Sequence, residues 1–243
     1  MIQRDIIDNI DVYARDFAQA SPFSHSYFQR FFDEDQLRAV KAELATYNSW
    51  FYDPDEYVAG HQVNKFFTPA PKGMGFEESI DYMKSHAPNT YSVLLYLQSE
   101  PVLKFLERLT GINNLVADGD WLGGGVHRIT TGGKLDIHAD FNIHWIQKTL
   151  HRRLNLLLYL NDPWLPEWEG NLELWSTDRT YCARVLPPVF NSCAIFRITD
   201  TAFHGHPIPL NTPPGIDRLS LALYYYTIDR PEEEKSASHP VLW

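Results

Sequence analysis

A histidine and an aspartate two residues apart, His138 and Asp140, are the residues of this chain best suited to bind a metal ion together. They stand in the segment Leu135-Asp-Ile-His-Ala-Asp-Phe141, where apolar and polar residues alternate as in a β-strand. Residues i and i+2 of a strand point to the same face, so the imidazole and the carboxylate can reach one ion. A hydrogen-bonded surface pair would have the same spacing, so a metal site also needs a third ligand.

Two histidines downstream, His204 and His206, are the candidates for that third ligand. They follow the apolar residues Ile195–Ile198, and a distant strand could bring either of them beside the first motif. His204 is preferred because it comes directly after the apolar residues that lead out of this predicted strand. Two imidazoles and one carboxylate form the facial triad that holds Fe(II) and leaves open positions for other ligands, although zinc, manganese or nickel could bind the same donors. Without the first motif, two histidines in a surface loop would be the default interpretation.

An arginine and a serine, Arg218 and Ser220, share one face of the predicted strand Arg218–Thr227. An arginine inside a sandwich or barrel needs an anion, and a guanidinium group matches a carboxylate through two parallel hydrogen bonds. The hydroxyl of Ser220 could assist. A salt bridge at the end of the strand would also explain Arg218.

A tyrosine, Tyr159, could supply a further hydroxyl to the same carboxylate. It shares a strand face with Asn155 and Leu157, whereas Leu154, Leu156, Leu158 and Leu160 form a core stripe on the opposite face. Packing alone would also explain Tyr159.

The first half of the chain has the pattern of helices. Leu37, Val40 and Leu44 recur at helical spacing behind an acidic first turn. Ser99–Gly111 is a second predicted helix, with a serine N-cap, a proline in its first turn and a glycine at its end. The aromatic-rich stretch Trp50–Phe67 between them predicts irregular structure or short strands.

From about Gly124 onward the apolar period changes to two, which indicates strands. Turn residues such as Thr131-Gly-Gly133 separate them, and this spacing is typical of a sandwich, barrel or jelly roll. The fold class is therefore predicted to be α+β and mainly β, with the N-terminal helices buttressing one sheet. The predicted strands are Val126–Thr130, Leu135–Ala139, Arg153–Leu160, Asn171–Trp175, Tyr181–Leu186, Ser192–Ile198 and Arg218–Thr227.

The composition excludes several classes of protein. A net charge of −10 disfavours a nucleic-acid partner, and we expect the basic cluster Lys148–Arg153 to contact solvent. The charged N-terminus does not resemble a signal peptide, and no apolar run is long enough to span a membrane, so a cytoplasmic protein without a membrane partner is expected. Cys182 and Cys193 are expected to be buried thiols rather than a disulfide. Nothing in the sequence indicates the oligomeric state.

Several motifs, in this order and at about this spacing, are shared with a known enzyme family. The chain resembles the prolyl 4-hydroxylase-like branch of the 2-oxoglutarate/Fe(II) oxygenases over about residues 124–228. The motifs that carry the resemblance are His138-Ala-Asp140, Arg153-Leu-Asn-Leu-Leu-Leu-Tyr-Leu-Asn161, Gly170-Asn-Leu-Glu-Leu-Trp175, His204-Gly-His-Pro207 and Arg218-Leu-Ser220.

The resemblance implies a double-stranded β-helix (jelly roll) with His138, Asp140 and His204 as Fe(II) ligands. It also implies Arg218 as the anchor for the C5 carboxylate of 2-oxoglutarate, with Tyr159 in support. The co-substrates would be 2-oxoglutarate and O2, with ascorbate as a stimulant, and the products would be succinate, CO2 and a hydroxylated substrate. Two departures from the family concern secondary contacts. His127-Arg128 replaces a tyrosine that many relatives have before the metal motif, and Gly170-Asn171 replaces a pair of glycines.

The expected organisation is a support region over residues 1–123, an oxygenase core over 124–228 and a solvated tail over 229–243. The substrate is expected to be an amino-acid residue in a peptide, as for the prolyl hydroxylases, or else a free amino acid or small metabolite. The segments Trp50–Phe67 and Phe141–Arg152 could form a lid or merely pack on the barrel. Two other classes stay open from the residues alone: a cupin-like metalloprotein that does not use 2-oxoglutarate, and a non-catalytic jelly roll used for binding.

Overall fold

The β-sheet of the protein curves into an open barrel. The computed structural model describes residues 1–52, 60–70, 73 and 75–243. The strands are β1 His25–Phe28, β2 Gln62–Thr68, β3 Val116–Ala117, β4 Gly125–His138, β5 His151–Tyr159, β6 Leu172–Trp175, β7 Cys182–Leu186, β8 Cys193–Arg197, β9 His204–His206 and β10 Arg218–Thr227. They form one 10-stranded sheet in the order β1-β8-β5-β10-β4-β9-β6-β7, with β2 paired to β4 and β3 paired to β10.

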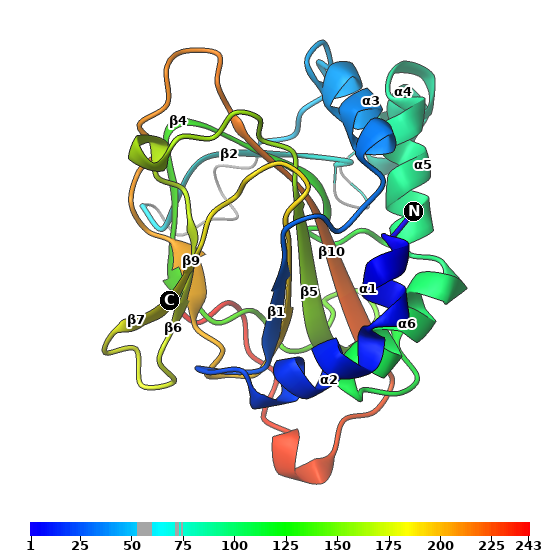
Figure 1. Cartoon of the computed structure of the whole chain (residues 1–243), viewed down its shortest axis with the longest axis vertical. Coiled ribbons are helices and arrows are strands. Elements are labelled where there is room, and N and C mark those ends of the chain that lie inside the picture. The colour runs from blue at the N-terminus through cyan, green and yellow to red at the C-terminus, as the bar shows by residue number, and fades with distance from the viewer. Residues whose placement is uncertain (53–59, 71–72, 74) are drawn as a thin grey trace.

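Two walls of this sheet face each other across the barrel (Figure 1). Strands β1, β8, β5 and β10 make one wall, β9, β6 and β7 make the other, and β4 and β2 cross between them. All the strand pairs are antiparallel. The predicted mainly-β jelly roll is therefore confirmed.

Strand β4 differs from the prediction of two strands with a turn at residues 131–133. It is one continuous strand whose first part pairs with β10, with Ile129 opposite Arg218, and whose last part pairs with β9, with His138 opposite His204. Gly132 has a φ of 79°, a backbone conformation that glycine adopts without strain. The glycines bend the strand from one wall to the other instead of reversing it.

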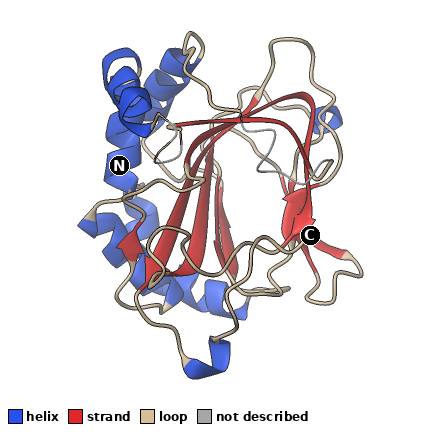
Figure 2. Cartoon of the chain, turned by 180° about the vertical axis from the view of Figure 1, so that it is seen from behind, coloured by secondary structure: helices blue, strands red, loops and turns tan. Residues whose placement is uncertain are grey.

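The helices cover the outer face of the β8-β5-β10 wall (Figure 2). They are α1 Arg4–Asp8, α2 Ile10–Gln19, α3 Glu34–Leu44, α4 Phe76–His86, α5 Pro88–Leu97 and α6 Glu100–Thr110, with short 3-10 turns at Pro166–Trp168 and Glu232–Glu234. The prediction was correct for α3, where Asp33 accepts a hydrogen bond from the Gln36 amide, and for α6, which ends at Gly111. Ser99 is the N-cap residue of α6, but its side chain makes no capping hydrogen bond. The other four helices also begin without a side-chain cap and were not predicted. None of the helices described is long and apolar enough to cross a membrane.

The leucine stripe of β5 attaches the barrel to these helices. Leu154, Leu156, Leu158 and Leu160 are fully buried in a core shared with the helices. Burying a leucine side chain stabilises a protein by about 1.5–3 kcal/mol. The alternate residues of β5 therefore face the barrel interior, as the sequence predicted for Tyr159.

The end of the chain differs from the predicted solvated tail. Glu232 and Glu233 are exposed, but Glu234 forms ion pairs with Arg153 and Arg197. Further on, Leu242 pairs with Ala139 through two backbone hydrogen bonds of 2.9 Å. The last residues therefore lie beside the metal motif of β4.

Replacement of Gly205 by alanine is expected to lower the free energy of unfolding by about 1–3 kcal/mol, the usual cost of overpacking. A Cβ at this position would lie 2.7 Å from the carbonyl oxygens of Leu135 and Asp136, so β9 would have to move away from β4. Urea denaturation measures the effect. Gly119→Ala is the matched control because no atom lies within 4 Å of its added Cβ, and equal stability losses would contradict the prediction.

Candidate functional site

A cavity of about 280 Å³ opens inside the barrel, between the two walls. Five of the six predicted site residues line it: His138, Asp140, His204, Arg218 and Ser220. The sixth, Tyr159, is fully buried behind Arg218. The fold therefore gathers residues that lie far apart in the sequence.

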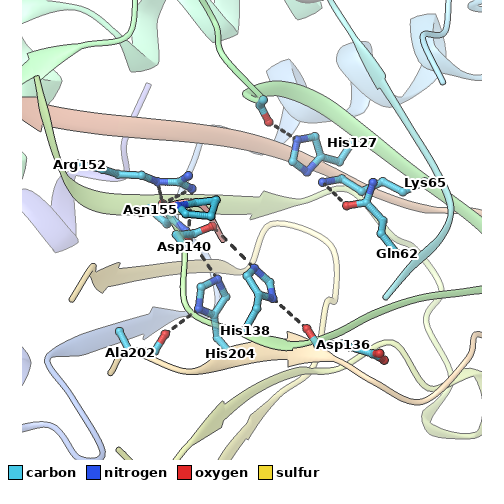
Figure 3. A network of polar contacts seen from close by, with 12 residues as sticks. Gln62, Lys65, His127, Asp136, His138, Asp140, Arg152, Asn155, Ala202 and His204 are labelled. Atoms are coloured by element: carbon cyan, nitrogen blue, oxygen red, sulfur yellow. Dashed lines mark hydrogen bonds and ion pairs between the residues drawn. The ribbon is translucent and has the colours of Figure 1, made fainter. Parts of the chain in front are cut away.

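Three of these side chains meet at one point of the cavity (Figure 3). The Nε2 atom of His138 lies 3.6 Å from Asp140 Oδ1, and that of His204 lies 3.4 Å from Asp140 Oδ2. The potential ligand atoms of all three lie within 4.8 Å of one another. All three residues are buried.

Hydrogen bonds orient both imidazoles. The Nδ1 atom of His138 donates to the carbonyl of Asp136 over 2.8 Å, and that of His204 donates to the carbonyl of Ala202 over 2.9 Å. A ring nitrogen that donates to a carbonyl carries the proton, so in each neutral ring Nε2 keeps the lone pair. Burial, and then the charge of His138, lower the pKa of His204 to about 4, so this ring is neutral near pH 7.

Two residues of β5 hold the carboxylate of Asp140. Asn155 Nδ2 donates to Oδ2 over 2.7 Å, and Arg152 Nη2 lies 3.0 Å from the same oxygen. Burial raises the pKa of Asp140, but Arg152 and the two imidazoles outweigh it and hold the pKa well below its usual range. Asp140 is therefore a fixed anion.

The role of Arg152 was not predicted. The sequence led us to expect the basic cluster Lys148–Arg153 to contact solvent, yet Arg152 and Arg153 are 1% and 3% exposed. The guanidinium carbon of Arg152 lies 3.6 Å from the ring centre of Tyr224. Asn155 was placed on the interior face by the strand period, which was the available signal for its contact with Asp140.

Asn155→Ala is expected to weaken metal binding by about 10–100-fold, the usual effect of losing a partner of a metal ligand. The change removes the donor to Asp140 and the acceptor for Arg152. Competition against a chelator of known affinity measures the loss. Asn113→Ala at an exposed position is the control, and an unchanged metal affinity in Asn155→Ala would refute the prediction.

The three donors fit Fe(II). Two imidazoles and one carboxylate come together in one group, and all three residues line the cavity. This is the two-histidine, one-carboxylate arrangement that leaves positions open for further ligands.

Arg218 lies in the same cavity without a negative partner. Its Nε donates to the carbonyl of Gly170 over 2.7 Å, and Nη2 lies 3.4 Å from the hydroxyl of Tyr159. No carboxylate of the described residues forms an ion pair with Arg218, because Asp217 pairs with Arg128 at 2.6 Å. Burial lowers the pKa of Arg218 and raises that of Tyr159 to about 12. A buried cation with no partner of opposite charge is expected to receive an anion.

Two further histidines line the cavity. His127 and Arg128 stand where many relatives have a tyrosine. His127 faces the cavity, and Arg128 faces outward. His127 Nε2 donates to the carbonyl of Gly123 over 2.7 Å. His206, the alternative third ligand, also lines the cavity, but it is not part of the metal-binding group.

The structure also locates the two segments proposed as lids and the two cysteines. The stretch Trp50–Phe67 lies partly outside the described residues, but Gln62, Lys65 and Phe67 line the cavity. Phe141 and Trp145 from the other proposed lid line it too. Both cysteines are free thiols; Cys193 is buried as predicted, and Cys182 is partly exposed.

A second group of potential ligands, Asp118, Asp120 and His144, is buried in the two loops that also carry Leu122 and Trp145, which line the cavity. His144 Nδ1 accepts hydrogen bonds from the amides of Ile146 and Gln147, so its proton lies on Nε2, which donates to Asp118 over 3.1 Å. An Nε2 that carries a proton has no lone pair for a metal. The group braces these two loops against each other.

Comparison with known proteins agrees with this geometry. Residues 124–226 match the family model described as the 2OG-Fe(II) oxygenase superfamily. A search of curated protein sequences returns no match to this chain.

Three solved structures share the fold. A 2OG-Fe(II) oxygenase family oxidoreductase from Burkholderia pseudomallei has a TM-score of 0.60 and 11% identity, covering 93% of this chain and 94% of its own. A prolyl hydroxylase from Trichoplax adhaerens, in complex with a peptide fragment of the hypoxia inducible factor oxygen degradation domain, has a TM-score of 0.59 and 15% identity, with coverages of 92% and 93%. HygX from Streptomyces hygroscopicus, with nickel and 2-oxoglutarate bound, has a TM-score of 0.56 and 14% identity, with coverages of 99% and 98%.

The prediction of an oxygenase that uses iron and 2-oxoglutarate is thereby confirmed at the level of the family. The cupin-like and the non-catalytic alternatives are not supported. The triad, the jelly roll and the family match agree: residues 124–226 carry a domain of the 2OG-Fe(II) oxygenase superfamily, and the chain as a whole has a fold like that of solved prolyl hydroxylases.

Proposed function

We propose that His138, Asp140 and His204 bind Fe(II), and that Arg218 anchors the C5 carboxylate of 2-oxoglutarate with support from Tyr159 and Ser220. The observation that carries the proposal is the presence of a three-donor metal group and an arginine without a counter-charge in one buried cavity. An α-keto acid with a second carboxylate can bind the metal through its keto acid end and Arg218 through its second carboxylate.

The residues of the chain bind and orient the metal and the co-substrate, and they exclude water from the site. The hydroxyl of Tyr159 stays protonated because burial raises its pKa to about 12, so it can donate to a carboxylate. The apolar side chains of Leu157 and Leu172 line the cavity and keep water from the reacting groups. When bound, Fe(II), 2-oxoglutarate and O2 supply the oxidising chemistry, with release of succinate and CO2.

Hydroxylation is the favoured outcome. Asp140 occupies the ligand position that a related halogenase would leave for chloride. Because Asn155 and Arg152 hold this carboxylate, a halide would have to displace a fixed anion.

The substrate we favour is an amino-acid residue of a peptide, of the prolyl type. The support is the likeness in fold to prolyl hydroxylases, one of which is bound to a peptide. A small molecule is the second candidate. Two observations support this second candidate. Pro240, Val241 and Trp243 from the end of the chain help to line the cavity, and HygX, which shares the fold, binds hygromycin B.

Turnover of 2-oxoglutarate to succinate across a panel of prolyl peptides, free amino acids and aminoglycosides tests the proposal. Fe(II) and ascorbate are supplied to every sample. Substrate-dependent succinate formation is expected with one class only. A protein that binds Fe(II) but forms no succinate with or without any panel member would contradict the proposed co-substrate.

A further inference from the structure

His206 has an unusual environment in the cavity. The residue is 4% exposed, and both of its ring nitrogens are buried without a hydrogen-bond partner in the described part of the chain. Burying an imidazole without partners is costly, so an orphaned buried polar group points to a bound molecule or ion. Because His206 lines the cavity, a ligand in the cavity is the group that can pair with it.

Strand β9 places His206 farther along the barrel than the metal group. His204 and His206 point to the same face because they are two residues apart on a strand. His204 lies opposite His138 on β4, whereas His206 lies opposite Leu135. His206 is therefore one step farther along the barrel than the third member of the triad.

The charges around His206 favour an anion there. The cationic side chains of Arg218 and Lys65 line the same cavity as His206. Among the described residues that line the cavity, the one carboxylate is Asp140, and Arg152 and Asn155 hold it. An imidazole ring carries at least one N–H donor in either protonation state, so His206 can donate to such an anion.

The donors of Arg218 are partly engaged within the protein. Its Nε is already bound to the carbonyl of Gly170, and its Nη2 contacts the hydroxyl of Tyr159. A carboxylate has two oxygens with about four acceptor sites. These sites leave room for a further donor beside Arg218, Tyr159 and Ser220.

We propose that His206 donates a hydrogen bond to the distal carboxylate of 2-oxoglutarate, beside Arg218. This rests on the proposed co-substrate function. It gives the second histidine of the His-Gly-His motif a role in binding the co-substrate and not the metal.

Two ligands that differ only at the distal end test the proposal. 2-Oxopentanoate has the keto acid end of 2-oxoglutarate but a methyl group in place of the distal carboxylate. Each is titrated anaerobically by calorimetry into Fe(II)-loaded protein, either wild type or His206→Val. His206→Val is expected to weaken 2-oxoglutarate binding by about 10–100-fold, as for a lost hydrogen bond to a charged group, and to leave 2-oxopentanoate binding unchanged. His206→Gln keeps a donor and is expected to recover part of the loss.

Each other outcome overturns the proposal. If His206→Val weakened the binding of both ligands equally, His206 would act at the keto acid end or in the scaffold. If 2-oxoglutarate binding were unchanged, His206 would make no contact with the distal carboxylate. Loss of iron in His206→Val would make the residue a metal ligand. A wild-type protein that holds iron but binds no 2-oxoglutarate would refute the proposed co-substrate itself, which the wild-type titration alone reveals.

Discussion

His204→Ala is expected to abolish stoichiometric iron binding and substrate turnover together, whereas His206→Ala keeps its iron. Loss of a partner that only supports a ligand costs about 10–100-fold in metal affinity, so loss of the ligand itself should exceed 100-fold. The two histidines are two residues apart on β9 and equally buried, which makes them a matched pair. Iron content after anaerobic loading and desalting measures the difference.

This pair is a sharper test than replacement of Asp140. Asp140→Ala should also lose the metal, but it would leave the buried Arg152 without its anion. Breaking a buried ion pair destabilises a protein by about 3–5 kcal/mol, so a loss of iron there would be mixed with a loss of fold. Retention of iron by His204→Ala, or its loss from His206→Ala, would reverse our assignment of the third ligand.

Arg218→Ala is expected to weaken 2-oxoglutarate binding by about 100-fold or more without changing iron affinity. Removing one partner of a buried, hydrogen-bonded charge pair costs about 2–5 kcal/mol, since the remaining charge is left buried. The distal carboxylate would be such a charge. Calorimetric titration of the iron-loaded protein and the KM for 2-oxoglutarate both report the loss.

The control for this prediction is Arg128→Ala. Arg128 faces outward from the adjacent strand β4 and pairs with Asp217, so its removal should leave 2-oxoglutarate binding within about twofold, as for a surface ion pair. A similar loss in both variants would indicate a general effect of removing positive charge. Loss of iron from Arg218→Ala would indicate a scaffold role for Arg218.

Strand periodicity predicted which neighbouring site residues share a face, whereas the grouping of distant residues came from the resemblance to the family. His138 and Asp140 share a face by local geometry alone, and so do Arg218 and Ser220. The pairing of β4 with both β9 and β10 then brings these faces together. The site could be predicted because each of its parts is local to one strand.

The residues that hold Asp140 could not be predicted in the same way. The contact of Arg152 and Asn155 with this carboxylate depends on how the end of β4 approaches the start of β5, which no local pattern encodes. The Thr131–Gly133 segment has turn composition, yet it continues β4, and its Gly132 amide and Gly133 carbonyl hydrogen-bond to the backbone of Leu210. Tertiary pairing overrode the local preference in both places.

Because β4 is one continuous strand, it fixes the distance between the triad and Arg218 in the barrel. One strand carries both registers, with Ile129 opposite Arg218 and His138 opposite His204. The separation between the guanidinium group and the triad is thus set by the rise of a single backbone, and no hinge between domains can adjust it. If the triad and Arg218 hold the two ends of 2-oxoglutarate as proposed, a keto diacid one methylene shorter or longer would have to give up one of its two ends.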